Sequence, residues 1–426
     1  MIDQIGDHAT THLAYDPPLT SDIESLARPV SRWFRSSRAP GALCGDAVDA
    51  VQGAVGPPGG VATLVVPADV SWQEAGEPTS GVPRSVLGTV GPDAVAEAAK
   101  ALRSGEPAVL LVGGRALRRQ GLSAAARIAQ ATGAKLLCET FPARIERGAG
   151  LPPVERLGYL AEFTMAQLQG ARHLVLADAL APVSFFAYPA VPGYLVPEDC
   201  EVHTLAGASD DVAGALEALV DTLGAAPLGP GATGTGAPAR PERPTGALDA
   251  QTMAAAIGAL LPEGAVVSDE GNTSGIFVSG ATAGAPPHDW LCLTGGAIGQ
   301  GLPVATGAAV ACPDRPVLCL EADGSAMYTL QSLWTQAREG LDVTTVLINN
   351  GSYAILELEL SRVGAGDPGP RARGMLDISH PDLNFAALAS GMGVPASRAT
   401  TAEEFTQQLE RAFATPGPAL VEAVLR

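Results

Sequence analysis

The chain has 426 residues, too long for one ordinary domain, so two or three folded units are expected. With 46% hydrophobic and 17% charged residues, it has the composition of a globular protein rather than a disordered or fibrous one. Its 45 acidic residues outnumber 26 basic ones, and the net charge of −19 would repel nucleic acid and anionic membranes, so neither is expected as a partner.

The N-terminal segment, MIDQIGDHATTH, carries acidic residues and lacks the apolar core of a secretory signal. Six cysteines are scattered along the chain without a C-x-x-C pair, which predicts buried, reduced thiols and a cytoplasmic location. The first strand-like run spans residues 61–66. A polar segment rich in Gly and Pro follows it, and we place the first domain boundary there, so that the first unit covers residues 1–83.

Residues 84–223 alternate strand-like runs with helical patterns, which is the signature of βαβ units. The strands are expected at 108–112, 135–138 and 173–177, with a helix over 123–132. This predicts a central, doubly wound, Rossmann-like α/β domain with a parallel sheet. Its Gly113-Gly114 turn lacks the full G-x-G-x-x-G pattern, so we expect a tight turn and no NAD site.

Residues 224–247 are rich in Pro, Gly and Thr, and such a composition cannot bury enough apolar surface to fold. They predict a linker, with a third domain over 248–426. Within this domain the stretch 290–313 has no charge and is long enough to span a bilayer. Its five glycines, with Pro303 and Gln300, favour a buried glycine-rich loop and helix, so no membrane partner is expected.

One βαβ crossover carries the most informative residues. A buried strand over 316–321 leads into Ala322-Asp323-Gly324-Ser325. A helix capped by Thr329 is expected next, with one apolar stripe, and Gly340 should end it. The members of that stripe are Leu330, Leu333, Trp334 and Ala337. A second strand over 343–348 ends in Asn349-Asn350-Gly351-Ser352-Tyr353, and the crossover should be right-handed.

If the two strands are neighbours, Asp323 and Asn350 lie side by side at the carboxyl edge of the sheet, where open α/β folds bind ligands. A carboxylate, an amide oxygen and a nearby carbonyl form an oxygen-only set that suits Mg²⁺. A diphosphate would complete the coordination. Gly324 would let the backbone approach its oxygens, and Ser325 could donate hydrogen bonds to them.

This spacing resembles the thiamin diphosphate signature, G-D-G followed about two dozen residues later by N-N, shared by acetolactate synthases, benzoylformate decarboxylase and pyruvate decarboxylase. The resemblance implies that thiamin diphosphate and Mg²⁺ are the cofactors. It makes Asp323 and Asn350 metal ligands through their side chains and Ser352 a ligand through its carbonyl. Ala322 replaces the usual first Gly, but it is small and touches no ligand, so binding should survive.

The run from Leu293 to Pro303 resembles the family loop that wedges a bulky side chain under the cofactor, and Ile298 falls at that position. Gly296 would then offer its carbonyl to the aminopyrimidine. By the same resemblance several other residues line the cofactor or the substrate. The cofactor-binding ones are Asn272, Thr273, Tyr353 and Ile355, and Leu356 would line the substrate pocket.

Segments such as GDHATTH, LLCETFPARIERGAG, APVSFFAYP and ADGSAMYTLQSLWTQARE extend the resemblance to an acetolactate synthase large-subunit-like group over essentially the whole chain. The implied fold is the thiamin diphosphate-binding fold, with a partial N-terminal domain, a central domain and a C-terminal cofactor domain. Residues 1–83 would be the second half of a pyrimidine-binding domain. The half that carries the activating glutamate is not matched, so no catalytic residue is assigned.

The resemblance implies decarboxylation of a 2-oxo acid with carboligation, as in the formation of 2-acetolactate from pyruvate in branched-chain amino acid biosynthesis. Without the glutamate we expect activity that is weak or depends on a partner chain, and family sites between subunits imply a homodimer or tetramer. Leu356 replaces the glutamate of pyruvate decarboxylases, and residues 356–360 lack the tryptophan of true acetolactate synthases. A benzoylformate decarboxylase-like enzyme and a non-catalytic cofactor-binding or assembly subunit therefore remain as alternatives.

The six histidines show no metal-ligand spacing, so we expect none of them to bind a metal. His8 and His12 could face the cofactor cleft, but we favour a surface or structural role for both. The other four histidines are weaker candidates for a functional role, and they are His173, His203, His288 and His380.

Overall fold

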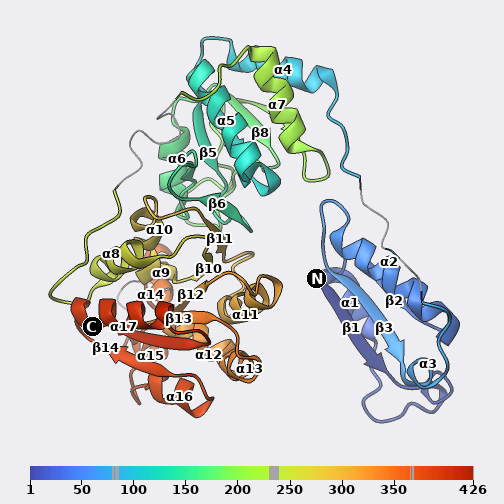
Figure 1. The fold of residues 1–426 in the computed structure, drawn as a ribbon. Helices are drawn as coiled ribbons and strands as arrows, with labels where there is room; N and C mark the ends of the chain where they lie inside the picture. Colours follow the sequence, from blue (N-terminus) through green and yellow to red (C-terminus); the bar gives the residue numbers. More distant parts are fainter. Residues whose placement is uncertain (79–80, 82–85, 230–238, 365, 367–368, 426) are drawn as a thin grey trace. The chain divides into compact units, whose positions relative to one another are not determined.

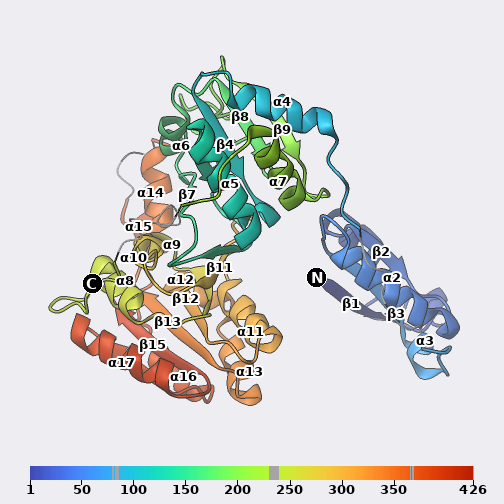
Figure 2. The same cartoon turned by 45° about the horizontal axis from the view of Figure 1, so that its top comes forward.

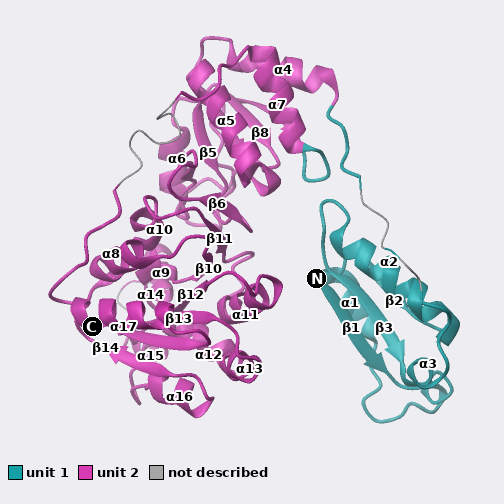
Figure 3. Cartoon of the chain, in the orientation of Figure 1, with its two compact units in different colours: residues 1–90, 207–211 teal, residues 91–206, 212–426 magenta. Residues whose placement is uncertain are grey.

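The computed structural model describes residues 1–78, 81, 86–229, 239–364, 366 and 369–425 (Figure 1). The chain forms two compact units (Figure 3). Unit 1 comprises residues 1–90 and 207–211, and unit 2 comprises residues 91–206 and 212–426. The predicted boundary at residue 83 lies outside the described residues, as do residues 230–238 of the predicted linker.

Unit 1 is built on a three-stranded parallel sheet in the order β1-β3-β2. The sheet strands are β1 Ile2–Asp7, β2 Trp33–Ser36 and β3 Ala62–Pro67, and the helices are α1 Ile23–Ala27, α2 Leu43–Val55 and α3 Ala68–Trp72. Ala50 and Ala54 of α2 pack against Leu64 and Val66 of β3 in one apolar cluster. The strand predicted over 61–66 is confirmed, but it begins and ends one residue later than predicted.

The first sheet of unit 2 is parallel, with five strands in the order β7-β5-β4-β8-β9 (Figure 2). Its strands are β4 Ala108–Val112, β5 Lys135–Cys138, β7 Glu155–Arg156, β8 His173–Ala177 and β9 Glu201–Ala206, and its helices are α4 Pro92–Leu102, α5 Arg119–Thr132, α6 Ala161–Leu168 and α7 Val212–Leu223. The three predicted strands are confirmed residue for residue. The helix predicted from 123 begins four residues earlier, at Arg119.

The second sheet of unit 2 has seven strands in the order β14-β15-β13-β12-β10-β11-β6. Its strands, apart from β6, are β10 Val266–Glu270, β11 His288–Cys292, β12 Val317–Ala322, β13 Val343–Asn349, β14 Ala396–Ala399 and β15 Ala419–Val424. Every residue of β13 is buried, as expected for a parallel strand with helices on both faces. The sheets thus have the predicted α/β class.

Helices cover both faces of this sheet. They are α8 Ala250–Leu260, α9 Asn272–Gly275, α10 Val278–Ala281, α11 Gly301–Ala311, α12 Asp323–Thr329, α13 Ser332–Glu339, α14 Ala354–Arg362, α15 Pro370–Leu376, α16 Phe385–Gly391 and α17 Ala402–Ala414. On one face, Leu302, Leu333 and Phe385 of α11, α13 and α16 pack against Val317 and Leu347. The uncharged stretch 290–313 begins in β11 and contains α11, which confirms the predicted helix. The loop before α11 was predicted to be buried, but its residues 294–298 are exposed.

One strand from the predicted central domain joins the sheet of the predicted third domain. β6, Ile145–Arg147, belongs by sequence to the middle segment, yet it pairs antiparallel with β11 at the edge of the seven-stranded sheet. Arg144 beside it donates to the Asp289 carboxylate at 2.6 Å. The sequence gives no sign of this exchange, because a three-residue strand is too short to show a pattern.

The helix that follows β12 differs from the prediction. It begins at Asp323, directly at the strand end, and breaks at residues 330–331 before α13. Thr329 is therefore not an N-cap, and its hydroxyl donates to the Gly299 carbonyl at 2.7 Å. Trp334 is 52% exposed and is not part of the apolar stripe. Gly340 ends α13 in the left-handed conformation, as predicted.

The described ends of the predicted linker are tied to folded parts of unit 2. Ala225 is buried, and the Arg240 guanidinium donates to the carbonyls of Gly258 and Leu261 at the end of α8. Polar contacts rather than an apolar core hold these ends.

Three cysteines, Cys138, Cys292 and Cys319, are buried free thiols, and the other three are half-buried. In the part of the chain that the structure describes, we find no helix with both the length and the apolar character to cross a bilayer.

His288 at the start of β11 makes the fold sensitive to acid. Its Nδ1 lies 2.8 Å from the Pro286 carbonyl, whereas its buried Nε2 has no hydrogen-bond partner among the described residues. Burial lowers the pKa of His288 to about 4, from 6.5. Between these two values the unfolded chain binds the additional proton, so stability falls as the pH drops from 6.5 toward 4.

We expect His288→Asn to reduce this acid sensitivity, because an amide can still donate to Pro286 but does not titrate. The wild-type protein should lose up to about 3 kcal/mol between pH 7.5 and pH 4 through this residue. Calorimetric melting of both proteins over this range measures the difference. His380→Asn, at an exposed position, is the control, and parallel curves for wild type and His288→Asn would contradict the prediction.

Candidate cofactor site

Three strands of the seven-stranded sheet end at the same edge. β10, β12 and β13 are parallel neighbours, and Ala322 of β12 is in register with Ile348 of β13. The next residues along the chain bring Asp323 and Asn350 to that edge, as the crossover predicts. The Gly351 amide donates to Asp323 Oδ2 at 2.7 Å, so the two segments are in direct contact.

Asp323 is a buried carboxylate, with 1% of its surface exposed. It accepts hydrogen bonds from two backbone amides, those of Gly324 at 2.9 Å and Gly351 at 2.7 Å. Burial raises the pKa of Asp323, while these amides oppose that shift. A carboxylate in this setting fits a cation, because a bound cation would offset the cost of its burial.

Asn350 is held in one orientation. Its Nδ2 donates to the Ser274 hydroxyl at 3.1 Å, and its Oδ1 accepts from the Ser352 amide at 3.0 Å. Oδ1 keeps a second lone pair for a metal ion. Ser352 forms an isolated bridge with Asp377, which holds its backbone in an extended geometry. The sequence did not single out Ser274, because an isolated serine carries no pattern.

The segment after β10 meets the segment after β12. Asn272 adopts a left-handed backbone, with φ of 47°, and its Nδ2 donates to the Ser325 hydroxyl at 2.9 Å. Asparagine tolerates this conformation better than most residues. Thr273 follows, half-buried, in α9. The fold therefore brings two predicted phosphate-binding segments, far apart in the sequence, into contact.

Glu270 anchors the loop that carries Ile298. Its two carboxylate oxygens accept hydrogen bonds from the backbone amides of Gly299 and Gly301. Thr329 holds the same loop through the Gly299 carbonyl. Ile298 is 44% exposed, so the loop presents its side chain rather than burying it in the core. Its amide donates to the Gly296 carbonyl at 3.0 Å.

A second buried carboxyl lies beside Glu270. Glu321 is in register with Glu270 across β12 and β10, and neither side chain is exposed by more than 1%. Burial, and then the charge of Glu270, raise the pKa of Glu321 well above 4.5. In the part of the chain that the structure describes, Glu321 Oε1 has no hydrogen-bond partner. We therefore assign the charge of the pair to Glu270, whose oxygens face two N–H groups.

Gly324 and Tyr353 are in close contact. A Cβ on Gly324 would lie 2.5 Å from Cε1 of the Tyr353 ring, so any larger residue would require the ring to shift. The ring thus covers the backbone that the sequence predicts to approach phosphate oxygens.

Polar contacts to the central domain hold α14, which has no buried residue. The hydroxyls of Tyr159 and Tyr188 donate to the Glu359 carboxylate at 3.0 and 2.6 Å. On the same helix Ile355 is half-buried and Leu356 is 46% exposed. Leu356 is therefore not part of the core, and its place in a substrate pocket stays a prediction.

Aromatic side chains of the central domain reach the loop at Gly296. A Cβ on Gly296 would lie 3.1 Å from Cζ of Phe185. Around Phe185 stand Phe186, Tyr159 and Phe141, with ring centroids 5.0, 5.3 and 5.9 Å away. We call these four residues the aromatic cluster. The sequence could not relate them to Gly296, because their proximity depends on how the two sheets pack.

The fold brings together two histidines that the sequence does not relate. Although the sequence shows no ligand spacing, the sheet brings His173 and His203 within hydrogen-bond distance of each other. His8 instead contacts the Pro18 carbonyl at 3.0 Å, within unit 1.

Comparisons with known proteins include this part of the chain. Residues 269–423 match the family described as "Thiamine pyrophosphate enzyme, C-terminal TPP binding domain". The whole chain is 56% identical over 430 residues to the "Putative acetolactate synthase large subunit IlvX" of Mycobacterium tuberculosis, and covers 81% of it. Over 50% of the chain it is 32% identical to benzoylformate decarboxylase of Pseudomonas aeruginosa, covering 39% of that protein.

Among solved structures, a thiamine diphosphate-dependent 4-hydroxybenzoylformate decarboxylase from Rhodococcus jostii matches with a TM-score of 0.80. The identity is 23%, and the match covers all of this chain and 82% of that chain, so it establishes the shared fold. The match to IlvX covers the whole chain at 56% identity, and it establishes the family as well as the fold. The chain belongs to the thiamine pyrophosphate-dependent enzymes, in their acetolactate synthase large-subunit-like group.

Proposed function

We propose that the chain binds thiamin diphosphate and Mg²⁺ and serves a 2-oxo acid decarboxylation with carboligation, of the acetolactate synthase type. The observation that carries the proposal is the meeting of Asp323 and Asn350 at adjacent strand ends. A buried carboxylate and an oriented amide there offer the hard oxygen ligands that Mg²⁺ prefers. The 56% identity to a relative named as an acetolactate synthase large subunit supports the reaction type.

The chain's own residues would do the binding and positioning. Asp323 and Asn350 would hold the metal through their side chains, and Ser352 through its carbonyl. Ser325 and Asn272, already in contact with each other, would face the diphosphate. Glu270 holds the loop that presents Ile298. When bound, thiamin diphosphate supplies the electron sink that decarboxylation of a 2-oxo acid requires.

The aromatic cluster supports a second candidate, a decarboxylase for aromatic 2-oxo acids. Phe185 and Phe186 are 43% and 52% exposed, so their faces are free to stack against an aryl group. Because Phe185 lies beside Gly296, the cluster would put such a group next to the cofactor loop.

Calorimetric titration with thiamin diphosphate, in Mg²⁺ and again in EDTA, tests the binding proposal. Binding is expected in the Mg²⁺ buffer but not in EDTA, and no binding in either buffer would refute the binding proposal.

Product analysis then separates the two candidate reactions. 2-Acetolactate from pyruvate supports the carboligase, and benzaldehyde from benzoylformate supports the decarboxylase. Metal-dependent binding without product from either substrate would favour a non-catalytic role.

A Phe185→Leu variant sharpens the choice between substrates. If the aromatic cluster holds an aryl group, kcat/KM for benzoylformate should fall about tenfold, the equivalent of one aromatic contact. The value for pyruvate should change little.

A further inference from the structure

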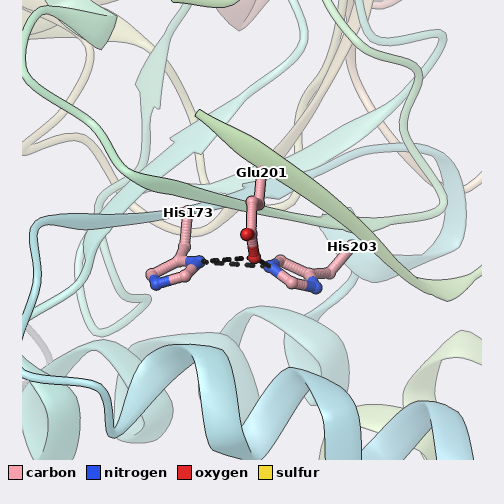
Figure 4. Close-up of side chains that lie close together, drawn as sticks. All are labelled: His173, Glu201 and His203. Atoms are coloured by element: carbon pink, nitrogen blue, oxygen red, sulfur yellow. Dashed lines mark hydrogen bonds and ion pairs between the residues drawn. The ribbon is translucent and has the colours of Figure 1, made fainter. Parts of the chain in front are cut away.

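The edge of the five-stranded sheet carries a second group of possible metal ligands. His173 begins β8, and Glu201 and His203 lie on the edge strand β9. The register pairs His173 with Glu201, and His203 lies two residues further along, so the three side chains share one face. Figure 4 shows them pointing toward one another. Within the described residues, this is the one group of three potential ligands whose donor atoms converge.

The spacing of the donor atoms matches a zinc ion. His173 Nδ1 and His203 Nε2 are 3.2 Å apart, and Glu201 Oε2 lies 3.8 Å from each of them. A triangle with these sides has a circumscribed radius of about 2.1 Å, so a point in its plane lies about 2.1 Å from all three atoms. Zinc bonds to His nitrogen and carboxylate oxygen are about 2.0–2.2 Å long.

The outer nitrogens of both imidazoles face carboxylates. His173 Nε2 lies 3.2 Å from Glu106, and His203 Nδ1 lies 3.2 Å from Glu97 of α4. Because a carboxylate accepts hydrogen bonds, each outer nitrogen carries a proton. In neutral rings the two inner nitrogens then direct lone pairs at each other, an arrangement that a cation between them would stabilise. Carboxylates behind the ligating histidines are the usual outer shell of zinc sites.

The surrounding charge also favours a cation. Three carboxylates face the imidazole pair, those of Glu97, Glu106 and Glu201. The nearby Arg172 is shared between Glu106 at 4.0 Å and Asp199 at 3.0 Å. The imidazole side chains are only about 10% exposed, whereas Glu201 is 74% exposed. An ion could therefore enter from the solvent side and keep a water ligand.

We propose that His173, Glu201 and His203 bind one Zn²⁺ ion, with water as the fourth ligand. The ion would tie the edge strand β9 to β8 and, through Glu97, to α4. This site is separate from the proposed Mg²⁺ site in its chemistry, because imidazole nitrogens select zinc over magnesium.

The test uses the full chain, produced without a polyhistidine tag, stripped with EDTA and titrated with Zn²⁺ in excess Mg²⁺. One Zn²⁺ per chain is expected. His203→Ala should abolish this binding, and Glu97→Gln should weaken it about 10- to 100-fold. His380→Ala, at an exposed histidine, should bind as wild type. Asp323→Ala should also keep the zinc, which separates this result from any failure of the cofactor site.

Further measurements distinguish loss of the zinc site from loss of folding. Circular dichroism checks each variant, and Glu201→Gln changes only an exposed side chain yet should still lower the affinity. Co²⁺ in place of Zn²⁺ should give the visible absorption of a tetrahedral site in wild type but not in His203→Ala. Absence of Zn²⁺ binding by the wild type would overturn the proposal. So would equal binding by a folded His203→Ala protein.

Discussion

Replacing Asp323 with alanine is expected to weaken the Mg²⁺-dependent binding of thiamin diphosphate by about 100-fold or more. The substitution removes the one charged group among the three proposed metal ligands. It also leaves the Gly324 and Gly351 amides without their acceptor, so the turn after β13 would lose a contact that orients it.

Calorimetric titration in Mg²⁺ measures the effect, and Asp314→Ala provides a matched control. Asp314 is an exposed aspartate that precedes β12, whereas Asp323 follows it, so the control removes an equal charge near the opposite end of that strand. Affinity within about threefold of wild type in a folded Asp323→Ala protein would remove Asp323 from the site. Equal losses in both variants would point to a general effect of charge.

The second large effect is expected from Glu270→Ala, which should lower the free energy of unfolding by about 3 kcal/mol or more. The carboxylate accepts from two backbone amides, and hydrogen bonds to charged groups contribute about 1.5–3 kcal/mol each. Their loss would release the loop that carries Ile298, so cofactor affinity should fall as well.

Urea unfolding measures the stability, and the same titration measures the affinity. Glu270→Gln should fall between wild type and Glu270→Ala, because an amide oxygen can accept from one N–H group while its NH₂ opposes the other. Glu263→Ala, in the loop between α8 and β10, is the control. If Glu270→Ala unfolds at the same urea concentration as wild type, the two hydrogen bonds do not stabilise the fold.

Glu321 behaves differently from Glu270 although both are buried glutamates in register. Glu270 faces two amides, whereas Glu321 Oε1 has no hydrogen-bond partner in the described structure, so only Glu270 is held as an anion. The sequence shows two acidic residues at strand ends and cannot distinguish an anchoring carboxylate from a neutral carboxyl. That distinction depends on which loop amides come within reach.

The sequence by itself determined the crossover that places Asp323 and Asn350 together. Two uninterrupted apolar strands with a helix between them allow essentially one parallel, right-handed arrangement, so local pattern was enough to predict it. The same pattern misplaced the start of the helix. A strand can turn directly into a helix at Asp323 without a capping residue, and the break after Thr329 reflects its contact with the loop at Gly299.

Only the tertiary structure decided which distant residues share a site. The exchange of β6 into the second sheet, the approach of Phe185 to Gly296 and the convergence of His173 with His203 all join segments remote in sequence. Glu201-Val202-His203 offers a weak local hint, since alternate residues of a strand share a face, but its partner lies on another strand. Pairing and packing between strands determine such contacts, and a linear pattern records neither.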